Sequence, residues 1–246
     1  MKDYLHDIIT YAHGLGVIDL VKINGTDTET EVTSYYSDGQ TVVIVNGMFK
    51  TPMTEFKGTF GMPNLSKLKT ILSFDDYDNE SKIDLIREDR DGEQDVPVRI
   101  HFETANKDFI NDYRLMSKSL INDKLKKAVF TGATWNVEFE PTVSAIGRLK
   151  KQAQANSEEL VFNTRTENGD LKIYFGDFSS HSGNFVFHSG VTGTLSRAWN
   201  WPVKFFLAIM DMPGNKIIRL ADAGAAEIVV DSGLATWTYY LPAQAK

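Results

Sequence analysis

The amino-acid sequence predicts an α+β fold of two similar halves, each with antiparallel strands and two helices on one face of a sheet. Helical periodicity of apolar residues occurs four times, and short β-branched or alternating runs fill most of the remaining chain. The predicted helices begin near residues 3 and 64 in one half and near 141 and 202 in the other. The order of elements therefore repeats, although the residues themselves do not.

The first half begins with a predicted amphipathic helix over residues 3–13. Short strands are expected from Ile18 to Phe60. Because glycine and asparagine favour positive backbone angles, three dipeptides in this stretch predict tight turns or bulges between strands: Asn24-Gly25, Asp38-Gly39 and Asn46-Gly47.

A second helix is predicted over residues 64–74, with Asn64 as its N-cap. Strands resume after the acidic loop 75–80 and continue to Met116. Residues 117–128 are rich in lysine and fit neither the helical nor the strand period, so they are predicted to connect two domains. The predicted domains are residues 1–116 and 129–246.

The second half is expected to begin with a long strand over residues 129–139. A helix follows over residues 142–156, with Pro141 in its first turn, where the missing N–H has no cost. Further strands are predicted as LVFNTRT, LKIYFGDF, NFVFHSGV and GTLSRAW, and Asn168-Gly169 is a strong hairpin signal. The last helix is expected to start after Trp201, and three strands complete the chain.

The helix over residues 142–156 has a cationic polar face and an apolar face that is predicted to hold Val143, Ile146, Leu149 and Ala153. In all four helices the polar face falls at positions i, i+4 and i+7. The polar positions are His6, Thr10 and His13; Ser66, Thr70 and Ser73; Ser144, Arg148 and Lys151; and Lys204, Ala208 and Asp211.

Composition limits the classes of function. With 26 Lys+Arg against 33 Asp+Glu, the formal net charge of the 246 residues is -7, so any basic surface that binds a polyanion is local. The chain has no cysteine, which excludes disulfides and thiolate chemistry. No stretch approaches the about 18 apolar residues of a membrane span, and the N-terminus lacks a signal-peptide pattern, so an intracellular protein is expected.

Four parts of the chain carry a resemblance to a known family: residues 64–73, the helix 142–155, the segment WPVKFFLAIMDMPGN and the turn Gly224-Ala225-Ala226. With these parts the sequence resembles the DNA polymerase sliding clamps, most closely the trimeric clamps of T-even-type bacteriophages. This resemblance covers nearly the whole chain. It implies the DNA-clamp fold, assembled as a homotrimeric ring around duplex DNA. It also implies partnership with a DNA polymerase and a clamp loader, no catalytic activity, no cofactor or metal, no membrane association, and a place in the host cytoplasm if the protein is viral.

The resemblance also assigns residues to sites. Asp3 and Asp7 depart from a basic lining in the first helix. The residues implied to face DNA in the pore are Lys2, Lys67, Lys69, Arg148, Lys150, Lys151 and Lys204. The residues implied to form a hydrophobic pocket for partner tails are Leu115, Leu120, Ile121, Val129, Tyr240, Leu241 and Pro242, for which ordinary packing is an equally good explanation.

Two alternatives stay open at this point. The first is a sequence-independent single-stranded nucleic-acid-binding module that uses exposed aromatic residues. The second is a β-rich enzyme or small-ligand-binding protein whose functional groups are dispersed along the chain. The sequence contains no P-loop, dinucleotide-binding or His-Glu-x-x-His motif that would favour the second alternative.

Overall fold

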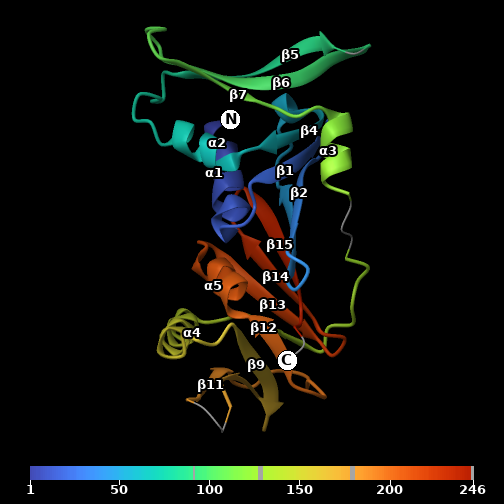
Figure 1. Cartoon of the computed structure of the whole chain (residues 1–246), viewed down its shortest axis with the longest axis vertical. Helices are drawn as coiled ribbons and strands as arrows, with labels where there is room; N and C mark the ends of the chain where they lie inside the picture. Colours follow the sequence, from blue (N-terminus) through green and yellow to red (C-terminus); the bar gives the residue numbers. More distant parts are fainter. Residues whose placement is uncertain (91, 127–129, 178–180, 245–246) are drawn as a thin grey trace. The chain divides into compact units, whose positions relative to one another are not determined.

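The computed structural model describes residues 1–90, 92–126, 130–177 and 181–244 (Figure 1). The chain forms two units. Unit 1 comprises Met1–Tyr35, Val45–Ala128 and Ser232–Trp237, and unit 2 comprises Tyr36–Ile44, Val129–Asp231 and Thr238–Lys246. Each unit thus includes a short segment from the far end of the sequence.

Unit 1 contains two antiparallel sheets and two packed helices. The strand order is β4-β1-β2-β3 in the first sheet and β5-β6-β7 in the second. The N-terminal part of β15 lies beside β3 in the first sheet. The elements that begin in the first half of the chain are α1 (Lys2–Tyr11), η1 (His13–Leu15), β1 (Leu20–Gly25), β2 (Thr30–Ser37), β3 (Val42–Phe49), η2 (Thr54–Phe56), β4 (Gly58–Pro63), α2 (Leu65–Leu72), β5 (Lys82–Arg90), β6 (Glu93–Glu103), β7 (Ile110–Arg114) and α3 (Lys118–Lys124).

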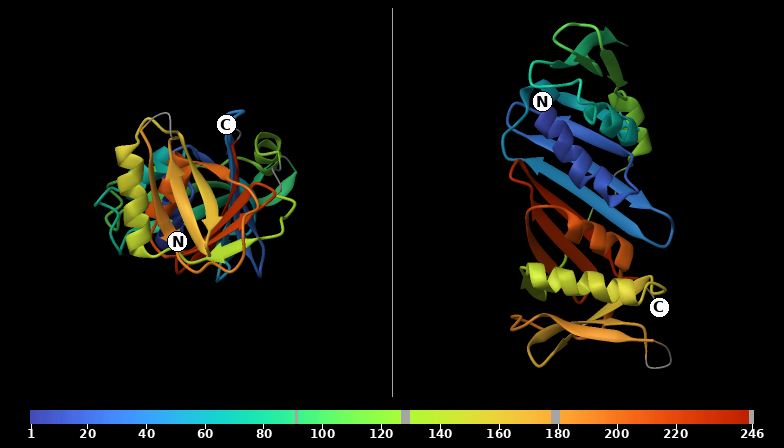
Figure 2. Two further views of the ribbon diagram at one scale, coloured as in Figure 1. Left: turned by 90° about the horizontal axis from the view of Figure 1, so that it is seen from below. Right: turned by 90° about the vertical axis from the view of Figure 1, so that its left-hand side faces the viewer.

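Helices α1 and α2 pack side by side, and Figure 2 shows α1 lying across the first sheet of unit 1. Leu5 and Ile8 of α1, and Leu68 and Ile71 of α2, are buried on the faces that their spacing predicts. Asp7 does not lie on the polar face with His6, because its carboxylate is buried and accepts hydrogen bonds from within unit 1.

The start of α2 is capped by a residue distant in sequence. Asn64 occupies the predicted N-cap position with a φ of 58°, but its side chain makes no capping hydrogen bond. Instead, Oδ1 of Asp19 accepts hydrogen bonds from the backbone N of Ser66 at 2.9 Å and from its Oγ at 2.8 Å. A carboxylate here satisfies a free N–H and lies favourably near the positive end of the helix dipole.

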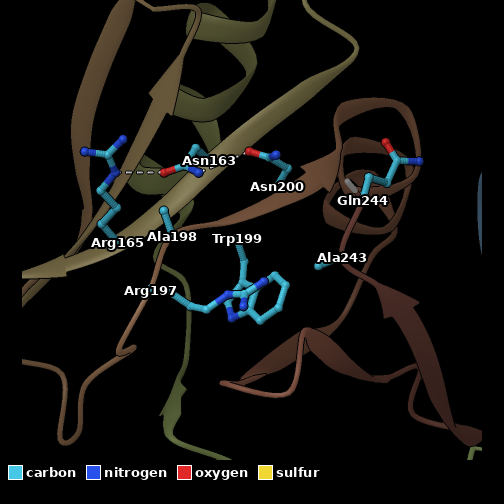
Figure 3. Close-up of a pocket in the computed structure, with 8 residues that line it drawn as sticks. All are labelled: Asn163, Arg165, Arg197, Ala198, Trp199, Asn200, Ala243 and Gln244. Carbon is cyan, nitrogen blue, oxygen red and sulfur yellow. Dashed lines mark hydrogen bonds between the residues drawn. The ribbon is translucent and has the colours of Figure 1, made fainter. Parts of the chain in front are cut away.

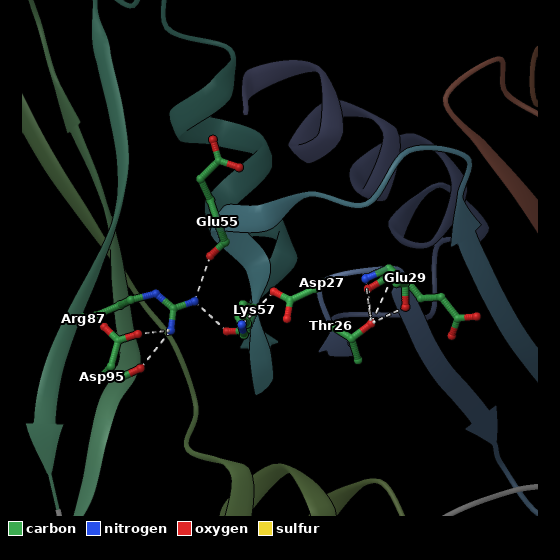
Figure 4. Close-up of polar contacts among 8 residues, drawn as sticks. Thr26, Asp27, Glu29, Glu55, Lys57, Arg87 and Asp95 are labelled. Carbon is green, nitrogen blue, oxygen red and sulfur yellow. Dashed lines mark hydrogen bonds and ion pairs between the residues drawn. The ribbon is translucent and has the colours of Figure 1, made fainter.

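Arg87 joins the second sheet of unit 1 to the segment before β4 (Figure 4). Its Nη2 donates to the carbonyl oxygens of Glu55 at 2.9 Å and Lys57 at 2.5 Å, and its Nη1 donates to the carbonyl of Asp95 at 2.8 Å. One guanidinium therefore satisfies carbonyl groups of the second sheet and of the segment before β4.

Unit 2 also contains two antiparallel sheets and two packed helices. The strand order is β15-β14-β13-β8 in one sheet and β11-β10-β9-β12 in the other. The elements that begin in the second half of the chain are β8 (Val137–Phe139), α4 (Val143–Ala155), β9 (Val161–Glu167), β10 (Asp170–Phe175), β11 (Gly183–His188), β12 (Trp199–Pro202), α5 (Val203–Asp211), β13 (Asn215–Ala221), β14 (Ala225–Asp231) and β15 (Ala235–Pro242).

Helix α4 begins at Val143, and Oγ1 of its N-cap residue Thr142 accepts a hydrogen bond from the backbone N of Ala145. Pro141 therefore precedes the helix and does not lie in its first turn as predicted. The apolar face is only partly as expected. Ala145, Leu149 and Ala153 are buried, whereas Val143 is 89% exposed and does not belong to the packed face. The buried residues are spaced four apart, which leaves the first helical residue on the outer side.

Several predicted local structures are wrong. Asn46-Gly47 lies inside β3 and forms no turn; glycine is required there because a Cβ would lie 2.7 Å from the ring of Trp237. Of the predicted strand 129–139, the described residues from 130 onward are regular only over β8. In the predicted strand GTLSRAW, only Trp199 belongs to a strand. The connector contains helix α3, which the sequence did not predict. Ile121 is the single buried residue of this helix, so no apolar periodicity marks it.

Candidate nucleic-acid interface and partner pocket

The outward faces of four helices carry the polar residues that the sequence spacing predicts. In each unit the apolar faces of two adjacent helices pack inward, which leaves the opposite faces in solvent. His13 and Ala208 are partly buried. The exposed residues at the other predicted positions are His6 and Thr10 of α1, Ser66 and Thr70 of α2 with the following Ser73, Ser144, Arg148 and Lys151 of α4, and Lys204 and Asp211 of α5.

Five of the predicted DNA-facing cations are exposed and unpaired. They are Lys67 and Lys69 on α2, Arg148 and Lys151 on α4, and Lys204 on α5. None of them forms an ion pair with another residue in the part of the chain that the structure describes. Such side chains remain available to phosphate groups, whose neutralisation releases counterions and drives sequence-independent binding.

The other two predicted cations already have partners. Lys150 of α4 forms an ion pair with Asp211 of the adjacent helix α5. The ammonium of Lys2 donates a hydrogen bond to the carbonyl oxygen of Tyr77. The ion pair offsets the charge of Lys150, whereas the hydrogen bond to a neutral carbonyl restrains the Lys2 ammonium and leaves its charge unchanged.

An apolar pocket of about 230 Å³ opens in unit 2 beside the C-terminal end of β15. We call it the apolar pocket. Its walls come from β3, the segment before β8, the start of β14 and β15. The residues that form most of its lining are Val42, Ile44, Phe130, Tyr240, Leu241 and Pro242.

The aromatic wall of the apolar pocket is held in place by stacking and by a buried polar group. The rings of Phe130 and Tyr240 stack with their centroids 4.3 Å apart. Burial and the carboxylate of Glu227, which accepts a hydrogen bond from the Tyr240 hydroxyl, raise the pKa of Tyr240 to about 12. Glu227 is in turn paired with Arg219 at 2.6 Å. Tyr240 is thus neutral and fixed in orientation near neutral pH.

Solved structures of archaeal proteins share this arrangement of elements. PCNA from Thermococcus kodakaraensis matches with a TM-score of 0.68 and 11% identity, covering 98% of this chain and 97% of that one. A. fulgidus PCNA, solved with the C-terminal region of FEN-1 bound, matches with a TM-score of 0.70 and 15% identity, covering 100% and 96%. The chain has the fold of the PCNA-type sliding clamps. No protein-family model and no curated protein sequence matches the chain.

The predicted α+β fold class is therefore confirmed, and the clamp fold extends over essentially the whole chain. At such low sequence identity the similarity concerns the fold alone. Functional residues are therefore identified from the geometry of this chain and not from the similar proteins.

The clamp fold places the predicted partner-pocket residues in different surroundings. Tyr240, Leu241 and Pro242 line the apolar pocket, whereas Val129 lies outside the described residues. The other three predicted residues belong to unit 1: Leu115 is partly buried, Leu120 is 56% exposed, and Ile121 is buried against Gly61.

Sequence reasoning missed Val42, Ile44 and Phe130 as pocket residues of this clamp fold. A signal was present in the unbroken apolar run of residues 42–45. Val43 and Val45 are buried, and Val42 and Ile44 lie on the opposite side of the strand, where they line the pocket. An unbroken run of this kind indicates that both faces of a strand contact apolar groups.

Among the described residues, no group of three or more His, Asp or Glu side chains could hold a metal ion. Within the same part of the chain, no helix is both long and apolar enough to cross a membrane.

Proposed function

We propose that this protein is a sliding clamp that closes as a homotrimeric ring around duplex DNA and tethers the replicative DNA polymerase. The observation that carries the proposal is the set of five unpaired cations on helices of a chain whose net charge is -7. A confined basic surface on an acidic body attracts DNA in one place and repels it elsewhere. The clamp fold supports a ring-forming scaffold without catalytic activity or cofactor.

Self-association of the chain is supported by two sheet edges. Strand β7 pairs with β6, and β11 pairs with β10, while among the described strands neither has a partner on its other side. Apolar side chains are exposed beside both edges: Phe109 (37%) and Ile110 (49%) at β7, and Val143 (89%) at the start of α4, which packs on β11. An antiparallel match of β7 with β11 of the next copy would cover both edges in a head-to-tail, closing arrangement.

Partner recognition is proposed at the apolar pocket, where a polymerase or clamp-loader tail would insert apolar side chains. One of the similar solved structures, that of A. fulgidus PCNA, has the C-terminal region of FEN-1 bound to it, which supports this kind of partner. Leu115, Leu120, Ile121 and Val129 do not line this pocket as described and are kept only as a separate proposed set of partner contacts. We also propose the T-even-type bacteriophage clamps as its relatives, with action in the host cytoplasm if the protein is viral.

The decisive test combines mass and topology. Native mass spectrometry should show a species of three chains of 27.6 kDa each. The protein should thread onto linear duplex DNA and stay through a high-salt wash only when both biotinylated ends are then blocked with streptavidin. A ring bound by topology resists salt, whereas ordinary phosphate contacts do not. A monomer that binds short single strands tightly, or equal retention on open and blocked DNA, would contradict the proposal.

A further inference from the structure

A second cavity in unit 2 has a lining unlike that of the apolar pocket (Figure 3). We call it the arginine pocket. Its volume is about 580 Å³, and no acidic residue lines it. The side chains that give it its chemistry are Asn163, Arg165, Arg197, Trp199, Asn200 and Gln244.

Both arginines are held in position by neutral groups, although the positive charge of Arg165 helps to lower the pKa of Glu167. The guanidinium carbon of Arg197 lies 3.8 Å from the centroid of the Trp199 ring, and that of Arg165 lies 4.9 Å from the ring of Tyr174. Nε of Arg165 also donates to Oδ1 of Asn163 at 3.0 Å. Neither arginine forms an ion pair with a residue in the described part of the chain.

Such guanidinium groups are prepared for an anionic ligand. Stacking against an aromatic ring fixes the plane of a guanidinium but uses none of its N–H donors. The Nη groups can then form two parallel hydrogen bonds to a carboxylate, which is a strong and directional interaction. The chain has seven more acidic than basic residues, yet neither of these two arginines forms an ion pair with a described residue. An anionic ligand would explain why both are left available.

Amide groups beside the arginines suit a peptide. Nδ2 of Asn163 donates to Oδ1 of Asn200 at 3.1 Å, and the backbone N of Gln244 donates to the carbonyl of Asn200 at 2.9 Å. Amide side chains both donate and accept hydrogen bonds, as the N–H and C=O groups of an extended peptide require.

The arginine pocket and the apolar pocket lie on the same C-terminal segment. Leu241 and Pro242 line the apolar pocket, and the next residues, Ala243 and Gln244, line the arginine pocket. The backbone N of Ala243 donates to the carbonyl of Gly224 at 2.8 Å, which fixes the segment that contributes residues to both cavities. At about 3.3 Å per extended residue, a peptide of a few residues can reach from one cavity into the other.

We propose that the arginine pocket binds acidic side chains of the same partner tail whose apolar residues occupy the apolar pocket. The inference rests on the proposed function, since it needs a tail in the apolar pocket. It adds a specificity rule: the tail carries Asp or Glu close to its apolar anchor. A nucleic-acid strand fits less well, because the adjoining cavity, which shares Asn163 and Arg165, is also lined by Glu159 and Asp177.

Peptide selection on the full chain tests this rule. A random twelve-residue peptide library is selected in parallel on the wild type, on Arg165→Gln/Arg197→Gln, and on Lys57→Gln/Lys82→Gln, which removes the same charge from two exposed lysines of unit 1. We expect all three proteins to select an apolar anchor. We expect Asp or Glu at a fixed spacing from it on the wild type and the lysine control, and no such preference on the arginine-pocket variant.

Binding of one selected peptide, followed by fluorescence anisotropy, should weaken about tenfold or more in Arg165→Gln/Arg197→Gln, as expected for loss of a charge-assisted bidentate contact. The corresponding Gln-for-Glu peptide should bind both proteins equally. An apolar anchor without acidic preference would overturn the inference and leave the proposed function intact. Absence of any apolar anchor would overturn the partner pocket itself, and displacement of the peptide by a single-stranded oligonucleotide from wild type alone would favour nucleic acid as the ligand.

Discussion

Asp7 shows how a single residue departs from its helical pattern for a tertiary reason. It lies on an amphipathic helix but is only 7% exposed. Its Oδ2 accepts hydrogen bonds from Nε1 of Trp237 at 2.8 Å and from Oγ of Ser232 at 3.1 Å. Burial raises the pKa of Asp7 above its ordinary value, and the two hydrogen bonds offset part of that rise. The residue therefore serves packing within unit 1 and not the outer face of α1.

Replacing Asp7 with asparagine should change how stability depends on pH. Because the pKa of Asp7 is raised in the folded state, the fold binds this proton more tightly than the unfolded chain does. The stabilisation is complete below the unfolded pKa near 3.8 and is lost as pH rises through the folded pKa. The asparagine of Asp7→Asn cannot titrate and keeps an acceptor oxygen. The free energy of unfolding of this variant should therefore not fall as the pH rises through the folded pKa, whereas that of the wild type should fall by about 1.4 kcal/mol per unit of pKa shift.

Urea unfolding between pH 3.5 and pH 8 measures this effect. Asp3→Asn removes an exposed carboxylate from the same helix and serves as the control. Relative to wild type, Asp7→Asn should gain unfolding free energy as the pH rises, whereas Asp3→Asn should not. Parallel pH curves for Asp7→Asn and wild type would show that the carboxylate is not perturbed in the fold.

At the scale of elements, individual side chains connect helices and strands that are not joined by backbone hydrogen bonds. Asp19 caps α2 from outside the helix, and Lys150 of α4 is paired with Asp211 of α5. Arg87 satisfies carbonyl groups next to β4 and on β6. Each contact joins residues that are distant in sequence or belong to different elements, so local sequence pattern contains no sign of it.

Arg87→Ala should lower the free energy of unfolding of the protein by about 1.5–3 kcal/mol, because carbonyl groups lose a charged donor and only part of that loss is recovered from water. Urea midpoints at neutral pH measure the change. Lys82→Ala is the control on the same strand, since its ion pair with Asp84 is exposed and should contribute less than about 1 kcal/mol. Equal effects of the two substitutions would mean that Arg87 does not join its sheet to the segment before β4 in solution.

At the scale of the whole molecule, the proposed ring depends on the exposed edges and the apolar residues beside them. Val143→Glu should prevent or weaken trimer formation at least tenfold, because a carboxylate would be buried at the proposed junction next to β11. The chain itself should remain folded, since Val143 is 89% exposed. Native mass spectrometry and circular dichroism measure the two outcomes. Gln154→Glu, near the other end of α4, should stay trimeric; an unchanged trimer in Val143→Glu would place the junction elsewhere.

The sequence by itself determined the α+β class, the four helices with their polar faces, and the hairpin at Asn168-Gly169, where both residues adopt a positive φ. These features depend on residues a few positions apart, whose periodicity or turn preference acts locally. It also located the cationic character of α2 and α4, because charge on a helix face can be read from spacing.

Only the tertiary structure decided which groups meet across long stretches of chain. It buried Asp7 against Trp237, neutralised Lys150, and placed Val42 and Ile44 beside Tyr240 in one apolar pocket. It also brought Arg165 and Arg197 to one cavity next to Gln244. The physical reason is that burial and ion pairing depend on distance in space, and strand pairing joins segments whose separation in sequence leaves no periodic trace.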